Sequence, residues 1–504
     1  MTSAFQGSLA IDQAYQKKFK ELKGDVPGRF VAQNYLDNST ALYHGEVIGL
    51  SFLPKAFDAA GMAELARIVD TTYTILEKVT RRYIADPALR RLFGFSGLLE
   101  ELIGLDCGYS CCIPIMRIDI FLDDQSGAFQ FCEINTDGTS AMNEDREGTN
   151  ALLASQLGQA AAAELGLHTQ ELFDPWVEGF LADYAEYAGQ RGAPAQPLIA
   201  IVDYLGSASM PEFEVFRQRF EARGLTCLIC DVDGLSYADG RLTGQDVNPQ
   251  HPLYGQRRAI DAVYRRAVTG DLLRDLEGSG GTGIGGNGAG SGNSAGGQKT
   301  GAWALVQAAR DQAACLIGGF RTQVVHSKQA FCAMHKPEFA AAGILNAAEM
   351  DFVMAHMPYT TELTNDPGLM AELTSNKDVW IAKPTDSYGA EGVFAGRDLS
   401  DTEWQERLQN CLAEPYVVQH FAQLYTMQNC LLTPRLANGK PAFSDVRKAL
   451  NDPGFAHLGL EPFNTLLGLF CYNGRFAGAY MRASQKSLIA GRVGGIIVPI
   501  LTTA

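Results

Sequence analysis

The sequence lacks the segments that would carry a protein into or through a membrane. No apolar run approaches the ~18–20 residues that a helical membrane span needs. The first 24 residues hold lysines at positions 17, 18, 20 and 23 but no apolar stretch, so they do not resemble a signal peptide. These absences predict a cytoplasmic protein with no membrane partner, and the 11 cysteines fit the reducing conditions of that compartment.

The sequence also lacks an excess of positive charge. It has 57 acidic residues against 41 basic ones, which gives a net charge of −16. Binding to a nucleic-acid backbone relies on clustered lysine and arginine, so the composition predicts no nucleic-acid partner. A nucleotide site is still compatible with this charge because it needs only a few local cations.

Several familiar motifs are missing as well. There is no GxxxxGK[ST] phosphate loop, and the α/β segment described below has no GxGxxG after its first strand. Cys107, Cys111 and Cys112 are clustered, but they do not form the paired CxxC motifs of a zinc site. We therefore interpret these three as core or turn thiols.

One stretch of unusual composition divides the chain. Residues 277–298 read EGSGGTGIGGNGAGSGNSAGGQ, a composition that cannot bury apolar area and that predicts a flexible linker over 276–300. Before it, apolar runs at 198–203, 227–232 and 260–266 and a helical pattern at 213–223 indicate a doubly wound α/β unit. The chain of 504 residues is thus expected to divide into segments at 1–184, 185–275, 276–300 and 301–504.

The two outer segments show mixed patterns. Helical spacing is found at 56–85 and 149–166, and residues 113–122 and 128–134 predict two strands around a turn. Further strands are expected at 379–384, 416–420, 476–482 and 495–500.

The pair of strands around residue 125 carries the first group of candidate site residues. Arg117 and Asp119 have i,i+2 spacing, as do Glu133 and Asn135, so each pair points to one face of its strand. A hairpin would bring all four together, with Ile118 and Ile134 facing the core. Two carboxylates and an amide oxygen suit Mg²⁺, and an arginine beside them can hold a phosphoryl oxygen. The alternative is a solvated hairpin face with an internal ion pair.

Two lysines are candidate phosphate ligands. Lys383 ends an apolar strand, and the following turn contains Gly389 and Gly392, whose small size lets backbone N–H groups approach a phosphate. Lys328 is a second candidate. The alternatives are a surface lysine in a hairpin turn and a lone solvated lysine.

Two further strands end in polar residues. Gln419 closes the strand at 416–420 and could offer hydrogen bonds to an adenine edge, although an ordinary edge strand is the alternative. Arg482 closes the strand at 476–482 and could reach an acyl phosphate, although it could also be a surface arginine.

Taken in order, these segments resemble the synthetase module of the glutathionylspermidine synthase family, which belongs to the circularly permuted ATP-grasp ligases. The resemblance rests on R-x-D at 117–119, E-x-N-x-D at 133–137 followed by Thr139 and Ser140, and H-S-K at 326–328. It continues with a K-P…G-x-x-G segment at 383–392, Gln419, and A-G-x-x-x-R at 477–482. Together the matched segments span roughly residues 110–500.

The resemblance implies an α+β, or α/β, fold in which a permuted ATP-grasp core and lid accompany a small Rossmann-like domain at 185–275. It implies ATP and Mg²⁺ as cofactors, and an enzyme that joins a small carboxylate, such as glutathione, to an amine, such as a polyamine. Homodimers are common among such ligases. The implied roles are metal binding by Asp119, Glu133 and Asn135; ATP binding by Lys328, Lys383, Gly389, Gly392 and Gln419; catalysis by Arg117 and Arg482; and binding of the acyl substrate at Ser140.

The chain departs from the family pattern at two informative positions. Gly138 stands where the family has a serine, and His420 stands where an acidic residue is common. Two other functions remain open from the sequence: a small-molecule kinase on the same scaffold, and a nucleotide-binding protein without turnover. Release of ADP that depends on an amine would distinguish the ligase from the kinase.

Overall fold

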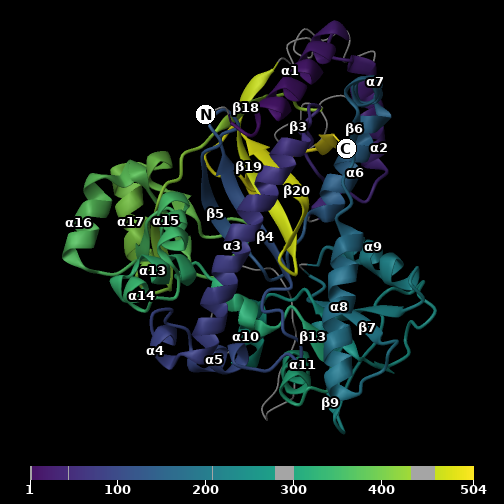
Figure 1. Ribbon diagram of the computed structural model, residues 1–504, viewed down its shortest axis with the longest axis vertical. Helices are drawn as coiled ribbons and strands as arrows, with labels where there is room; N and C mark the ends of the chain where they lie inside the picture. Colours follow the sequence, from purple (N-terminus) through teal and green to yellow (C-terminus); the bar gives the residue numbers. More distant parts are fainter. Residues whose placement is uncertain (1–2, 44, 207, 278–299, 433–459, 504) are drawn as a thin grey trace.

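The computed structural model describes residues 3–43, 45–206, 208–277, 300–432 and 460–503. Several sheets and the helices around them confirm the expected mixed α/β architecture (Figure 1). The ATP-grasp assignment itself stays a prediction. Almost all of the predicted linker at 276–300 lies outside the described residues. None of the helices in the described part combines the length and apolar character that crossing a membrane requires.

A six-stranded antiparallel sheet forms the centre of the molecule. Its strands follow the order β21-β20-β19-β4-β5, and β18 pairs with β19. The strands are β4 (Ile115–Leu122), β5 (Phe129–Asn135), β18 (Thr426–Asn429), β19 (Glu461–Tyr472), β20 (Arg475–Ser484) and β21 (Ile496–Val498).

Alternation of side chains explains the β4–β5 hairpin. Ile118 and Ile134 are opposite each other in register, and both are buried in the core, as the sequence predicts. The register shifts between Asp119 and Ile120, so Cys132 is the extra residue of a bulge on β5. Helix α3 (Ala59–Ala85) packs across the apolar face of this sheet (Figure 1).

The central strand β19 is absent from the sequence-based prediction. Its run Leu466–Cys471 is almost continuously apolar and is consistent with a buried strand or a buried helix. In the structure it joins β4 to β20, which are more than 350 residues apart in the chain. The expected strands at 476–482 and 495–500 correspond to β20 and β21.

The amino-terminal part packs helices and two small sheets against the central sheet. The predicted helix at 149–166 is two helices, because Ser155 ends α6 and its hydroxyl accepts a hydrogen bond from the N–H of Gly158 in α7. The helices are α1 (Gln6–Glu21), α2 (Val26–Asp37), α4 (Pro87–Arg90), α5 (Gly97–Ile103), α6 (Met142–Ala154), α7 (Gln156–Leu165) and α8 (Phe173–Arg191). The strands are β1 (Leu42–Tyr43) with β2 (Glu46–Val47), and β3 (Lys55–Phe57) with β22 (Ile500–Thr503) and β6 (Leu167–His168).

A parallel sheet forms the second body, shown in teal in Figure 1. Its order is β13-β12-β7-β8, and β13 follows residues 276–300, so this sheet extends beyond the expected boundary at 275. Its strands are β7 (Leu198–Asp203), β8 (Thr226–Asp231), β12 (Ala262–Arg265) and β13 (Cys315–Ile317), with helices α9 (Met210–Glu221), α10 (Thr269–Leu276) and α11 (Gly301–Arg310). A small antiparallel sheet lies beside it, formed by β9 (Ser236–Ala238), β10 (Arg241–Gly244) and β11 (Arg258–Ala259).

The third body is a four-stranded antiparallel sheet with short helices, shown in green in Figure 1. Its order is β14-β17-β15-β16. The strands are β14 (Thr360–Glu362), β15 (Trp380–Pro384), β16 (Phe394–Ala395) and β17 (Tyr416–His420). The helices are α12 (Gln323–His326), α13 (Gln329–His335), α14 (Pro337–Ala341), α15 (Ala347–His356), α16 (Pro367–Ser375) and α17 (Asp401–Cys411). We call this body the lateral sheet.

Candidate active site between two sheets

The hairpin brings the predicted carboxylates together on the polar face of the central sheet. Asp119 on β4 and Glu133 on β5 are cross-strand partners. The side-chain amide of Asn135 donates to Asp119 Oδ2 at 3.3 Å and to Glu133 Oε1 at 3.4 Å. The three predicted metal ligands therefore lie side by side.

Two arginines bind the carboxylate of Asp119. Arg117 makes a bidentate pair with it, with Nε 2.6 Å from Oδ1 and Nη2 3.0 Å from Oδ2. Arg482 on β20 donates to the same Oδ2 at 3.0 Å. The guanidinium carbons of both arginines lie over the Tyr480 ring, at 5.6 and 5.8 Å from its centre. Asp119 is only 1% exposed, so the two guanidinium partners offset the cost of burying its carboxylate.

The two lysines approach from the lateral sheet and its flanking helices. Lys383, at the end of β15, donates to the Cys132 carbonyl at 3.2 Å and to Gln419 Oε1 at 2.7 Å. Lys328 Nζ lies 4.0 Å from Glu133 Oε2 and donates to the Ser387 carbonyl at 3.2 Å. Four cations thus surround two carboxylates where the two sheets meet. We call Arg117, Asp119, Glu133, Asn135, Lys328, Lys383 and Arg482 the polar cluster.

The pKa values reflect this excess of positive charge. Burial by itself would raise the pKa of Glu133, but Lys328, Lys383 and the two arginines lower it to about 2. Burial lowers the pKa of Lys328, and the charge of Glu133 opposes that shift. Such a site favours a ligand with several negative charges.

The predicted adenine ligand and the glycine turn lie next to Lys383. The buried side chain of Gln419 bonds Lys383 through its oxygen and donates to Thr360 Oγ1 at 2.9 Å, so this amide orients the lysine. Gly389 and Gly392 both have positive φ, at +64° and +71°. A Cβ at Gly392 would come within 2.7 Å of the Pro384 ring, so the turn requires glycine there.

Ser140 lies at the other end of the polar cluster. Its carbonyl accepts a hydrogen bond of 2.8 Å from Arg117 Nη1, and it comes just before α6. The structure therefore brings the predicted acyl-substrate residue next to the predicted catalytic arginine.

Beyond Ser140 lies a charged group that sequence reasoning missed. Glu212 on α9 accepts hydrogen bonds from the N–H groups of Met142 and Asn143, at 2.9 and 3.3 Å, and thereby caps α6. Its other oxygen bonds Arg266 Nη1 at 2.8 Å. Glu144 lies in the first turn of α6 with Oε2 buried and unpaired in the described part of the chain. Burial, and then the charge of Glu212, raise the pKa of Glu144 to about 8.

A small apolar cluster borders the polar one. Phe121 on β4 and Leu466 on β19 contribute from the central sheet, and Ala422 contributes from the segment after β17. Ile489 completes the group, and Cys132 packs against it. Lys383 donates a hydrogen bond to the carbonyl of Cys132, so this apolar cluster lies directly beside the lysine in space.

The polar cluster offers a divalent cation the oxygen atoms of two carboxylates and one amide. In the described residues, no three His, Cys, Asp or Glu side chains gather in a way that could hold a metal alone. Mg²⁺ does not require such a cage, because it commonly takes one or two carboxylates and completes its shell with phosphates and water. Asp119 and Glu133 fit that pattern, provided that Asn135 turns its oxygen inward.

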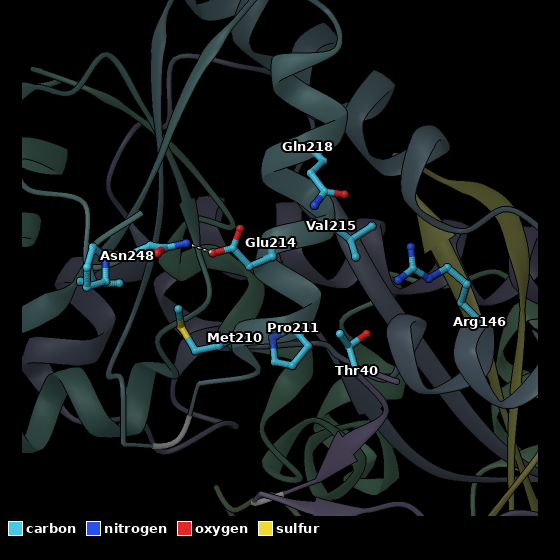
Figure 2. Close-up of a pocket in the computed structure, with 10 residues that line it drawn as sticks. Thr40, Arg146, Met210, Pro211, Glu214, Val215, Gln218 and Asn248 are labelled. Atoms are coloured by element: carbon cyan, nitrogen blue, oxygen red, sulfur yellow. Dashed lines mark hydrogen bonds between the residues drawn. The ribbon is translucent and has the colours of Figure 1, made fainter. Parts of the chain in front are cut away.

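A separate groove lies outside the polar cluster. Its volume is about 510 Å³, and α9 contributes Met210, Pro211, Glu214, Val215 and Gln218 to its lining. Figure 2 shows Arg146 and Asn248 on opposite sides of these α9 residues. None of the site residues predicted from the sequence lines this groove.

Comparison with known proteins gives a likeness in fold but no match in sequence. No protein-family profile matches the chain, and no curated protein sequence matches it. Among solved structures, the fold is similar to that of a glutathione synthetase-like effector (GSS30) from Globodera pallida, in its apo form. The TM-score is 0.53 at 11% identity, over 94% of this chain and 96% of the other. At that identity the likeness concerns the fold alone.

Proposed function

We propose that this protein is an ATP-dependent carboxylate–amine ligase that forms an amide through an acyl phosphate. The observation that carries the proposal is the polar cluster, where Asp119 and Glu133 lie among four cations between two sheets. An excess of fixed positive charge suits a triphosphate, and phosphoryl transfer depends mainly on positioning and charge stabilisation. The likeness in fold to a glutathione synthetase-like protein supports the same reaction class.

The nucleotide would lie between the two sheets. Lys328 and Lys383 would bind its phosphates, and the apolar cluster around Leu466 and Ala422 offers a surface for the base. Asp119, Glu133 and Asn135 would hold Mg²⁺ through oxygen atoms, and the bound ion would neutralise phosphate charge. The turn with Gly389 and Gly392 would cover the phosphates with backbone N–H groups.

The acid would react first. A carboxylate oxygen held near Ser140 attacks the γ-phosphorus of ATP, the bond to the bridging oxygen breaks, and ADP leaves. Arg117 and Arg482 stabilise the charge that develops on the transferring phosphoryl group. The amine nitrogen then attacks the acyl carbon, phosphate leaves, and the nitrogen gives up a proton.

Glu144 is placed to receive that proton. It lies close enough to Arg117, Glu212 and Arg266 for their charges to act on its carboxyl group. A pKa of about 8 lets the group accept a proton near neutral pH. Its unpaired oxygen also provides an acceptor for an incoming ammonium or amine.

The proposal is tested by screening acids and amines for ADP release, with detection of the amide product by mass. Glutathione and polyamines are the first acids and amines to include. We expect ADP release that depends on both substrates and on Mg²⁺. Asp119→Asn with Glu133→Gln should abolish it, and Asp351→Asn with Glu338→Gln, the same chemical changes at exposed positions, should not.

Two results would contradict the ligase. ADP release that needs an acid but no amine, with an acyl or other phosphorylated product, would indicate a kinase. Normal activity in the double variant of Asp119 and Glu133 would exclude the polar cluster as the site.

A further inference from the structure

Asp137 has no part in the chemistry proposed above, yet it is the most heavily bonded carboxylate near the polar cluster. Arg265 holds it by two hydrogen bonds, from Nη2 to Oδ1 at 2.7 Å and from Nη1 to Oδ2 at 3.1 Å. Thr269 donates to it through its N–H, at 3.0 Å, and through its hydroxyl. Thr322 Oγ1 donates to Oδ1 at 2.8 Å.

These partners belong to three different parts of the molecule. Asp137 follows β5 of the central sheet, Arg265 ends β12 of the parallel sheet, and Thr269 begins α10. Thr322 lies just before α12, in the segment that leads to Lys328. One carboxylate therefore joins the central sheet, the parallel sheet and the chain that carries a candidate phosphate ligand.

The neighbouring residues strengthen the same connection. The N–H of Thr136 donates to His326 Nδ1 at 3.2 Å, and its hydroxyl donates to the Thr322 carbonyl at 3.1 Å. On the other side, the Gly138 carbonyl accepts a hydrogen bond of 3.4 Å from Arg266. Residues 136–138 are thus fixed between two bodies, directly after Asn135 and two residues before Ser140.

The environment keeps Asp137 charged. Burial would raise the pKa of this carboxyl, but the Arg265 guanidinium, first among several partners, holds it well below its usual range. Arg265 is equally buried, and it also donates to the Ala267 carbonyl at 2.8 Å and lies over the Phe320 ring. Neutralising Asp137 would leave this guanidinium without its counter-charge.

We propose that Asp137 is a positioning residue whose ion pair with Arg265 sets the distance between Asn135 and Lys328. The inference rests on the proposed function, in which those two residues hold the metal ion and the phosphates. Asp137 itself touches neither, and it acts through the turn at 135–140 and the segment at 320–328.

The test uses the full chain with Asp137→Asn and measures both amide hydrogen exchange and the affinity for Mg·ADP. We expect exchange at 136–141 and 320–328 to accelerate at least 10-fold, while exchange in α3 and β19 stays unchanged. Affinity for Mg·ADP should fall at least 10-fold. Asp145→Asn is the matched control, because Asp145 is also buried but bonds only Gln170 and the Ile500 N–H among the described residues.

Several outcomes would overturn the proposal. The first is that exchange in Asp137→Asn is unchanged in both segments. The second is that exchange accelerates by the same factor throughout the molecule. The third is that exchange accelerates locally while the affinity for Mg·ADP is unchanged. If Asp137→Asn does not fold, Thr322→Val is the alternative, because it removes one hydrogen bond to Asp137. It should accelerate exchange in the same two segments about 3-fold, and unchanged exchange would contradict the positioning role of Asp137. Wild-type protein that binds no Mg·ADP would instead refute the proposed function. The exchange pattern would then still show whether Asp137 holds the two segments in place.

Discussion

At the scale of single residues, Lys383 has the clearest relation to a ligand. The residue is only 6% exposed, yet in the described part of the chain both hydrogen bonds of its ammonium go to neutral oxygens. A buried ammonium with neutral partners gains from a nearby anion. We expect Lys383→Met to weaken Mg·ATP binding by about 10- to 100-fold, the equivalent of roughly 1.5–3 kcal/mol, as measured by titration calorimetry.

Lys336 provides the matched control for that variant. Its ammonium is paired with Glu362 at 2.9 Å and bonds the Leu92 carbonyl, so it has no part in the polar cluster. Lys336→Met should leave nucleotide affinity unchanged. Equal affinities in the wild type and in Lys383→Met would remove this lysine from the site.

Glu144 makes a second prediction at the residue scale, this time in the pH dependence of turnover. If its ionised carboxylate accepts the proton from the amine, activity should rise with pH and reach a plateau above about pH 8, where Glu144 is ionised. Glu144→Gln should lower the plateau by about 100-fold or more and should remove this rising limb from the pH profile. A rising limb that persists in the variant would show that another group, such as the amine itself, determines it.

At the scale of the secondary-structure element, β19 positions the polar cluster through a glycine. Gly468 is the cross-strand partner of Asp119, and a Cβ there would lie 2.7 Å from Arg117 Cδ and 2.9 Å from Asp119 Oδ1. Gly468→Ala should therefore displace the ion pair and lower turnover about 100-fold, since small displacements of catalytic groups have large effects. The free energy of unfolding should fall by only about 1–3 kcal/mol, measured by denaturant titration.

Gly189 on α8 is the control for this substitution. A Cβ at that position meets nothing within 4 Å, so Gly189→Ala should raise the free energy of unfolding by about 0.5–1 kcal/mol without loss of activity. Full activity in Gly468→Ala would mean that the Arg117–Asp119 pair tolerates displacement, or that it is not used.

Elements with a strong local pattern were those that the sequence could predict. The hairpin of β4 and β5 alternates clearly, so Ile118, Ile134 and the opposing polar residues could be assigned to their faces in advance. The central strand β19 was not predicted, because its apolar run shows neither strand nor helix periodicity and its partner strand β4 is about 350 residues away. Glu144 and Glu212 escaped for a related reason: acidic residues in helical sequence are usually solvated, and only tertiary packing buries these two.

At the scale of the whole molecule, the buried carboxyl groups fall into two sets with opposite effects on stability. Burial raises the pKa of Asp12 to about 6, of Asp145, Asp183 and Asp203 to about 7, and of Glu144 to about 8. Nearby cations lower the pKa of Glu133 to about 2 and also lower that of Asp137. The first set favours the folded state when protonated, and the second favours it when ionised.

The stability of the protein should consequently be greatest in mildly acid solution. A raised pKa contributes stability that is complete below the unfolded value of about 4 and is lost as the pH rises through the folded value. A lowered pKa contributes stability that is present above the unfolded value and is lost as the pH falls through the folded value. We expect the free energy of unfolding to be highest near pH 4 and to fall by about 3 kcal/mol or more by pH 8, because each unit of pKa shift corresponds to ~1.4 kcal/mol. Thermal unfolding across this pH range at constant ionic strength measures the effect. In Asp145→Asn the side chain cannot ionise, so stability should fall less as the pH rises. Stability that stays constant or rises from pH 5 to 8 would show that these carboxyl groups ionise normally, and Glu144 would then no longer be suited to accept a proton near neutral pH.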